Sequence, residues 1–150
     1  MNRKLFYLSS GAVFALDRVI KALLGEKHFT LIPHVLGVNG TRNTGMAFGW
    51  FAGGTVMLIG FTLVLLAGLF WYMKKHEMRA LELLGLGLMT GGALGNLFDR
   101  IVYGYVIDML EPLFVDFFIF NIADAGITGG AVLLGAAILF GKEDTKDGTA

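Results

Sequence analysis

Long apolar segments constrain the fold of this chain more than any other feature of its sequence. An α-helix needs about 20 mostly apolar residues to cross a lipid bilayer. Residues 52–73 meet this requirement without a charged side chain, and residues 5–24, 80–101 and 120–140 meet it with one to three each. The composition agrees, since only 16% of the residues are charged, whereas soluble domains carry roughly 25%. We therefore predict an all-α membrane protein with four transmembrane helices.

The basic residues predict how these helices are oriented. Lys and Arg are enriched on the cytoplasmic side of membrane proteins. Here they cluster before the first segment, between the second and third, and after the fourth, at Arg3, Lys4, Lys74, Lys75, Arg79, Lys142 and Lys146. Both termini are therefore expected in the cytoplasm, and loops 25–51 and 102–119 on the outer side. Residues 1–150 are expected to form a single integral-membrane domain.

The first outer loop carries a β-hairpin signal. Residues 28–38 are rich in strand-forming residue types, and they are followed by Asn39-Gly40, a dipeptide typical of tight hairpin turns. We therefore predict a small extracytoplasmic sheet between the first and second helices, formed by a hairpin with Asn39-Gly40 at its turn.

Glycines recur every four residues along the third segment, at Gly87, Gly91 and Gly95. Small residues at this spacing form a stripe that allows two helix backbones to approach closely within a membrane. The stripe therefore predicts close packing of the third helix against a neighbour.

Several classes of site are disfavoured by the composition. The chain has no cysteine, which removes a thiol nucleophile, a disulfide framework and any Cys-ligated metal from consideration. Its formal net charge of zero gives no argument for a nucleic-acid partner. His76-Glu77 is not followed by the second histidine of an H-E-x-x-H metal site. No metal site is therefore predicted.

Ionisable residues within the apolar segments need an explanation, because a charge at bilayer depth is costly and often functional. Asp17 and Lys21 are separated by four residues and share a helix face, which suggests a neutralised pair with Lys21 reaching toward the outer interface. Asn96, Asp99 and Arg100 share a face near the outer end of the third segment. They are interpreted as an interfacial anchor or as support for an adjacent site.

Two further acids lie at the same predicted depth. Asp108 follows the third segment in the outer loop, and Asp124 lies near the start of the fourth with Asn121 on the same face. Two carboxylates held close together share a proton, so that one acts as a base toward water while the other polarises a carbonyl group. Spacing alone is also compatible with two solvated acids that do not interact. Glu111 and Asp116 lie in the same loop as Asp108, so spacing does not identify the pair.

Five motifs in order resemble signal peptidase II, the lipoprotein signal peptidase family, over nearly the whole chain. They are similar to the family elements D-x-x-x-K, N-x-G-x-A-F-G, G-G-x-x-G-N-x-x-D-R, G-x-V-x-D and F-N-x-A-D, and here occupy residues 17–21, 43–49, 91–100, 104–108 and 120–124. Arg18 stands where the family often has glutamine, and Met109 where phenylalanine is common. Neither departure removes a catalytic group of the family.

The resemblance implies a bacterial inner-membrane aspartic endopeptidase that cleaves prolipoproteins before a diacylglyceryl-modified cysteine. It assigns Asp108 and Asp124 as the catalytic pair at the outer face and sets Glu111 and Asp116 aside. It implies no metal or cofactor, a lipidated prolipoprotein and membrane lipids as partners, no nucleic acid, and a monomer. Residues expected to bind substrate or support the site are Asn43, Gly45, Asn96, Asp99, Arg100, Asn121, Asp17 and Lys21.

A small proton-coupled transporter is the alternative from another class of protein. Asp17, Lys21 and Asp124 would then form a relay within the membrane. The clustering of polar residues near one end of the predicted bundle, together with a second helix that carries no charge, argues against a path across it.

Overall fold

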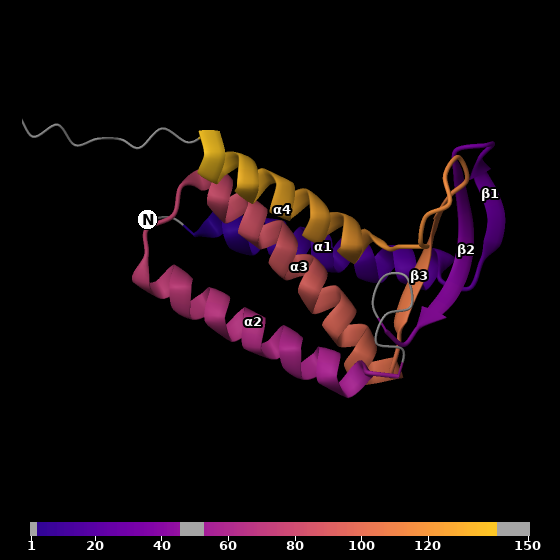
Figure 1. The fold of residues 1–150 in the computed structure, drawn as a ribbon, viewed down its shortest axis with the longest axis horizontal. Helices are drawn as coiled ribbons and strands as arrows, with labels where there is room; N and C mark the ends of the chain where they lie inside the picture. The colour runs from indigo at the N-terminus through magenta and orange to yellow at the C-terminus, as the bar shows by residue number, and fades with distance from the viewer. Residues whose placement is uncertain (1–2, 46–52, 141–150) are drawn as a thin grey trace, which may run out of the picture.

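The computed structural model describes residues 3–45 and 53–140 of the chain. These residues form a mostly helical structure with a small antiparallel sheet at one end of the helices (Figure 1). The elements, in chain order, are α1 (Lys4–Leu24), β1 (His28–Ile32), β2 (Leu36–Asn43), α2 (Thr55–Lys75), α3 (Ala80–Tyr103), β3 (Val106–Pro112) and α4 (Ile122–Phe140).

Three helices, α2, α3 and α4, are long and apolar enough to cross a membrane. Their bounds lie within a few residues of those predicted. The predicted start of the second helix at residue 52 lies outside the described residues, and α2 begins at Thr55. Helix α3 ends at Tyr103 because Gly104 adopts a left-handed conformation, with φ 81°. Helix α1 has 21 residues, the same length as α2. It is less apolar than the other three helices because it contains the charged residues Lys4, Asp17, Arg18 and Lys21.

Helix α3 packs closely against α1 and α4, and glycines make these contacts possible. A Cβ atom on Gly91 would lie 2.4 Å from the carbonyl oxygen of Ser10 in α1. On the opposite side, a Cβ atom on Gly92 would lie 2.2 Å from the carbonyl oxygen of Ala123 in α4. The predicted close packing along the glycine stripe is therefore confirmed, and α1 is the neighbour.

Helix α2 is placed differently from the other helices. Near the sheet its start meets the end of α3, where the Thr55 hydroxyl donates to the carbonyl oxygen of Gly104 at 2.9 Å, and α2 lies apart from α4 over its length (Figure 1). At the far end, an apolar cluster that includes Phe6, Met73 and Leu86 closes the bundle. The Arg3 guanidinium also donates to the carbonyl oxygen of Met73, which ties α1 to the end of α2. Between these two ends, α2 forms one wall of a cavity.

The sheet has the strand order β1-β2-β3, with both pairs antiparallel. The predicted position of the hairpin turn was wrong. The chain reverses at residues 33–35, where His34 has φ 59°, and Asn39-Gly40 lies within β2 at an irregularity between Val38 and Thr41. Gly40 is needed there because a Cβ atom would lie 2.2 Å from the carbonyl oxygen of Gly25, just after α1. Gly40 therefore allows β2 to lie close to the end of α1, and it does not reverse the chain.

The third strand comes from residues 102–119, for which the sequence predicts a loop and no strand. Strand β3 pairs with β2 so that Asp108 lies opposite Thr41, and Val106 opposite Asn43. An isolated bridge between Leu110 and Phe120 then brings the chain back to the start of α4. The sheet thereby places segments of the α1–α2 and α3–α4 connections beside the ends of α3 and α4.

Candidate active site

Asp108 projects from β3 and is almost completely buried, with 3% of its surface exposed. Its two carboxylate oxygens accept hydrogen bonds from different side chains. The Asn43 amide on β2 donates to Oδ2 at 2.9 Å, and the Asn121 amide donates to Oδ1 at 2.6 Å. The antiparallel register of β2 and β3 positions Asn43, whereas Asn121 is the residue that precedes α4.

Asp124 occupies the first turn of α4, where a carboxylate is favoured by the helix dipole. The Asn96 amide on α3 donates to its Oδ1 at 2.8 Å. Asn121 and Asp124 also cap the helix reciprocally. The Asn121 backbone N–H donates to Asp124 Oδ2 at 3.2 Å, and the Asp124 N–H donates to Asn121 Oδ1 at 2.9 Å. Asn121 therefore binds both acids and joins them into one cluster.

The environment of Asp108 disfavours its charged form. Burial, followed by the negative charge of Asp124, raises the pKa of Asp108 to about 6. Hydrogen bonds from Asn43 and Asn121, and the positive charge of Lys21, oppose this increase. A carboxyl group with a pKa near 6 exchanges a proton readily around neutral pH, which suits it to acid–base chemistry.

Four charged side chains form a compact cluster between α1 and α3, which we call the ion quartet: Asp17, Arg18, Lys21 and Asp99. Each cation contacts both carboxylates. Arg18 lies 2.7 Å from Asp17 and 2.6 Å from Asp99, and Lys21 lies 3.0 Å from Asp17 and 2.7 Å from Asp99. The carboxylates are fully buried. Since their charges balance, the quartet is neutral at a depth where a lone charge would be costly.

The ion quartet also contacts the backbone next to each member of the acid pair. Asp17 accepts a hydrogen bond at 2.9 Å from the N–H of Ala123, the residue before Asp124. Asp99 accepts one at 3.1 Å from the N–H of Ile107, the residue before Asp108. The two carboxylates that hold these peptide groups are bridged by the same two cations. The separation of β3 from the start of α4 is therefore linked to the geometry of the quartet.

Asp17 and Lys21 form the predicted ion pair, but the expectation that Lys21 reaches toward the outer interface was wrong. Its side chain is almost fully buried in the quartet, and its Nζ also lies 3.2 Å from Asn96 Oδ1. The same Asn96 holds Asp124 through its amide nitrogen. Packing of α3 beside α1 decides this outcome, because it supplies Asp99 as a second counter-ion.

Arg100 lies on the other side of the acid pair. Its guanidinium donates to the Gly45 carbonyl oxygen at 2.9 Å, and the Gly45 N–H donates to Asn43 Oδ1 at 2.9 Å. Among the described residues Arg100 forms no ion pair, because Asp99 is engaged by the quartet. The rest of the motif that contains Gly45, from residue 46 onward, lies outside the described residues.

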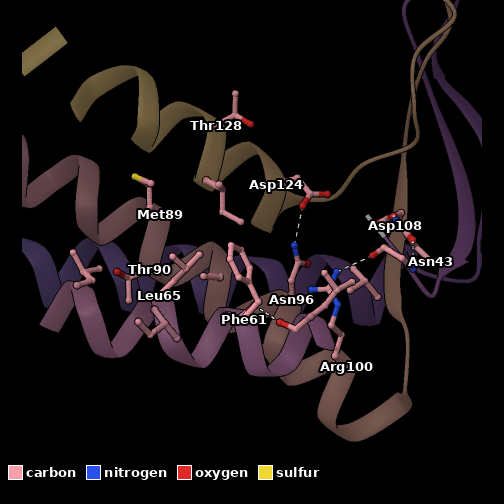
Figure 2. Close-up of a pocket in the computed structure, with 18 of the residues that line it drawn as sticks. Asn43, Phe61, Leu65, Met89, Thr90, Asn96, Arg100, Asp108, Asp124 and Thr128 are labelled. Atoms are coloured by element: carbon pink, nitrogen blue, oxygen red, sulfur yellow. Dashed lines mark hydrogen bonds between the residues drawn. The ribbon is translucent and has the colours of Figure 1, made fainter. Parts of the chain in front are cut away.

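A cavity of about 570 Å³ opens beside the acid pair and extends between α2, α3 and α4 (Figure 2). Its end near the sheet is polar, and its remaining walls are mostly apolar. The lining includes Asn43, Gly45, Asn96, Arg100, Asp108 and Asp124 at the polar end, and Leu58, Phe61, Leu65, Leu66, Leu69, Leu86, Met89 and Ile127 elsewhere. Within residues 3–45 and 53–140, no group of three His, Cys, Asp or Glu side chains could hold a metal ion.

The structure brings together all the site residues named from the sequence. Two contributors were missed. Arg18 was noted only as a departure from a motif, although its position beside Asp17 placed a second cation next to an acid that needed neutralising. Thr90, which lines the cavity, gave no sequence signal. The two alternative acids of the outer loop differ in placement: Asp116 is exposed, and Glu111 lies on β3 three residues beyond Asp108.

Comparisons with known proteins agree with this architecture. Residues 9–140 match the family described as signal peptidase (SPase) II. The lipoprotein signal peptidase of Clostridium acetobutylicum is 33% identical over 140 residues, covering 91% of this chain and 88% of that protein. That of Lactococcus lactis is 40% identical over 111 residues, covering 74% of each. A solved structure of a bacterial membrane enzyme, 30% identical, superposes with a TM-score of 0.81 over 97% of this chain and 93% of that one.

The apolar helices, together with an acid pair at the polar end of a cavity, define a membrane-embedded enzyme. The chain belongs to the signal peptidase II family and is accordingly a peptidase.

Proposed function

We propose that this protein removes signal peptides from lipid-modified prolipoproteins, by hydrolysing the peptide bond before the diacylglyceryl-cysteine with a water activated by Asp108 and Asp124. Membership of the signal peptidase II family and the relatives named lipoprotein signal peptidase support the substrate class. The observation that carries the mechanism is the pair of carboxylates from β3 and α4, joined through Asn121 at the polar end of an apolar cavity.

In the proposed reaction the two aspartates share one proton. The ionised carboxylate accepts a proton from water, whose oxygen attacks the scissile carbonyl carbon, while the protonated carboxyl donates a hydrogen bond to the carbonyl oxygen. Collapse of the tetrahedral intermediate breaks the C–N bond, and a carboxyl group delivers a proton to the departing amine. The raised pKa of Asp108, about 6, supports a shared proton near neutral pH.

The surrounding residues have proposed supporting roles. Asn43, Asn96 and Asn121 orient the acids through the hydrogen bonds described above. Arg100, which lines the cavity without a carboxylate partner among the described residues, is positioned with Gly45 to bind polar groups of the substrate.

The ion quartet supports a further proposal, that α1 is the fourth transmembrane helix. Its charged side chains face Asp99 of α3, so α1 can lie in the bilayer without exposing these charges to lipid. We propose a monomeric, single-domain protein of the bacterial inner membrane, in contact with lipid, with cytoplasmic termini and the acid pair at the outer face. A scissile bond beside a lipidated cysteine is held near that interface by its acyl chains.

The test is cleavage of a lipidated prolipoprotein peptide by the purified full chain and by Asp108→Asn and Asp124→Asn variants. We expect cleavage by the parent and a loss of at least about a thousandfold in each variant, because either substitution removes a group that must exchange a proton. Asp116→Asn is the matched control, since it makes the same chemical change at an exposed acid of the same segment. It should cleave at the parental rate.

The possible results separate the acid pair from the family assignment. Full activity in either Asp variant, with folding confirmed by thermal unfolding, would contradict the proposed pair. An inert parent in a bilayer that keeps it folded would contradict prolipoprotein cleavage itself.

A further inference from the structure

Thr90 presents a buried hydroxyl group that has no hydrogen-bond partner. Its side chain, in the middle of α3, is 2% exposed, and no donor or acceptor contacts Oγ1 in the part of the chain that the structure describes. A hydroxyl group within an apolar environment is destabilising unless it is hydrogen-bonded. Threonines in membrane helices commonly meet this need by donating to the backbone carbonyl one turn earlier.

A second threonine of the same cavity follows that common pattern. Thr62 of α2 donates through Oγ1 to the carbonyl oxygen of Leu58 at 2.8 Å. Both threonines line the cavity, on opposite walls. Thr62 thus satisfies its hydroxyl group within its own helix, whereas Thr90 does not.

Thr90 lies on the same face of α3 as the polar residues beside the acid pair. Thr90, Ala93, Asn96 and Arg100 all line the cavity, with spacings of three or four residues. At 1.5 Å of rise per residue, Thr90 is about 9 Å from Asn96 along the helix axis. Figure 2 shows Thr90 at the end of the cavity remote from Asp108, near Leu65. Thr90 is therefore the polar residue of α3 that lines the deep, apolar part of the cavity.

We infer that the Thr90 hydroxyl donates a hydrogen bond to a carbonyl oxygen of the substrate seated in the cavity, and so helps to determine substrate affinity. The inference rests on the proposed function. A lipidated peptide brings two kinds of carbonyl near the acid pair: the ester carbonyls of its diacylglyceryl group and the backbone carbonyls of its signal peptide. Either carbonyl oxygen loses its hydrogen bonds to water when it enters an apolar cavity. The Thr90 hydroxyl, which has no partner among the described residues, then supplies a replacement hydrogen bond.

Replacing Thr90 by valine separates this role from a structural one, because valine has nearly the same shape and lacks only the hydroxyl. If Thr90 has no partner in the complex, the substitution removes an unsatisfied polar group. Thermal stability then rises or stays the same, and kinetics do not change. If Thr90 binds the substrate, KM rises and kcat/KM falls by about threefold to tenfold, the usual range for one neutral hydrogen bond.

The experiment compares the parent, Thr90→Val, Thr90→Ser and Thr62→Val as purified full chains in one lipid environment. Thr90→Ser keeps the hydroxyl and should retain most of the parental kcat/KM. Thr62→Val makes the same chemical change on the opposite wall, at a hydroxyl already bonded to its own helix, and should have a smaller effect. Two substrates are used, a peptide with an ester-linked diacylglyceryl group and one with an ether-linked dialkylglyceryl group, which lacks the lipid carbonyls.

A loss in Thr90→Val with the ester substrate alone supports the inference and identifies a lipid ester as the acceptor. An equal loss with both substrates supports it and identifies a peptide carbonyl. Unchanged kinetics on both substrates, or an equal loss in Thr62→Val, would overturn the inference. The proposed function fails separately, because its failure appears as an inactive parent enzyme.

Discussion

Replacing Asp108 by asparagine should change how the stability of this protein depends on pH, independently of catalysis. In the folded protein the pKa of Asp108 is about 6, raised from 3.8 by burial and by Asp124. As pH rises, the unfolded chain therefore loses this proton first, while the folded chain retains it to about pH 6. Between these values the folded state binds more protons, so its free energy of unfolding falls with increasing pH.

The size of this effect follows from the shift in pKa. The increase is roughly two units, and each unit corresponds to 1.36 kcal/mol, so ionised Asp108 costs the folded parent about 3 kcal/mol above pH 6. Asparagine carries no charge and avoids that cost. It also has only one acceptor oxygen, whereas Asn43 and Asn121 each donate to a separate oxygen of Asp108. One of these two hydrogen bonds is then lost, which costs about 0.5–1.5 kcal/mol at every pH.

The variant should therefore be less stable than the parent at pH 4 and close to it, or more stable, at pH 8. The assay is thermal unfolding of both proteins in the same detergent at pH 4, 5, 6, 7 and 8. A change of about 3 kcal/mol corresponds to roughly 6–12 °C in the difference between the two Tm values. Asp116→Asn, at an exposed acid, should show a Tm difference from the parent that stays constant with pH.

A Tm difference between Asp108→Asn and the parent that is also constant from pH 4 to pH 8 would refute the reasoning. It would mean that Asp108 is ionised at the same pH in the folded and unfolded chains. The proposal that the acid pair shares a proton near neutral pH would then lose its physical support.

Two further predictions concern the packing around the acid pair. Asp99→Asn leaves two cations, buried Lys21 and half-buried Arg18, against one carboxylate and should lower the free energy of unfolding by about 3–5 kcal/mol. Chemical denaturation measures this, and a loss below about 1 kcal/mol would show that the quartet is not needed for stability. Gly91→Ala should destabilise the protein by about 1–3 kcal/mol, because its Cβ would lie 2.4 Å from the Ser10 carbonyl oxygen. Gly68→Ala on α2, where a Cβ meets nothing within 4 Å, is the control, and equal effects at both glycines would contradict close packing as the cause.

Much of the fold follows from local patterns that survive in the tertiary structure. Apolar segments of about 20 residues specify the helices whatever their neighbours are, because the backbone must satisfy its own hydrogen bonds within a bilayer. The glycine spacing on α3 likewise depends only on helix geometry. The position of the hairpin turn does not. Asn39-Gly40 is a turn signal in isolation, but β2 runs across the end of α1, where only glycine at position 40 fits against Gly25.

The residues of the site also divide into those that the sequence identified and those whose contacts only the tertiary structure decided. The resemblance of five motifs to a known family named Asp108, Asp124 and the asparagines around them, whereas spacing alone left the acid pair open. The partners of Lys21 and Arg18 depended on which helix packs beside α1, because a buried charge is neutralised by whatever tertiary contact supplies its counter-ion. For Thr90, only the tertiary structure showed that its hydroxyl has no hydrogen-bond partner within residues 3–45 and 53–140. The sequence by itself thus determined which segments form helices and which residues are polar within them, and the tertiary structure decided which of those residues meet, because contacts between distant segments are not encoded in local periodicity.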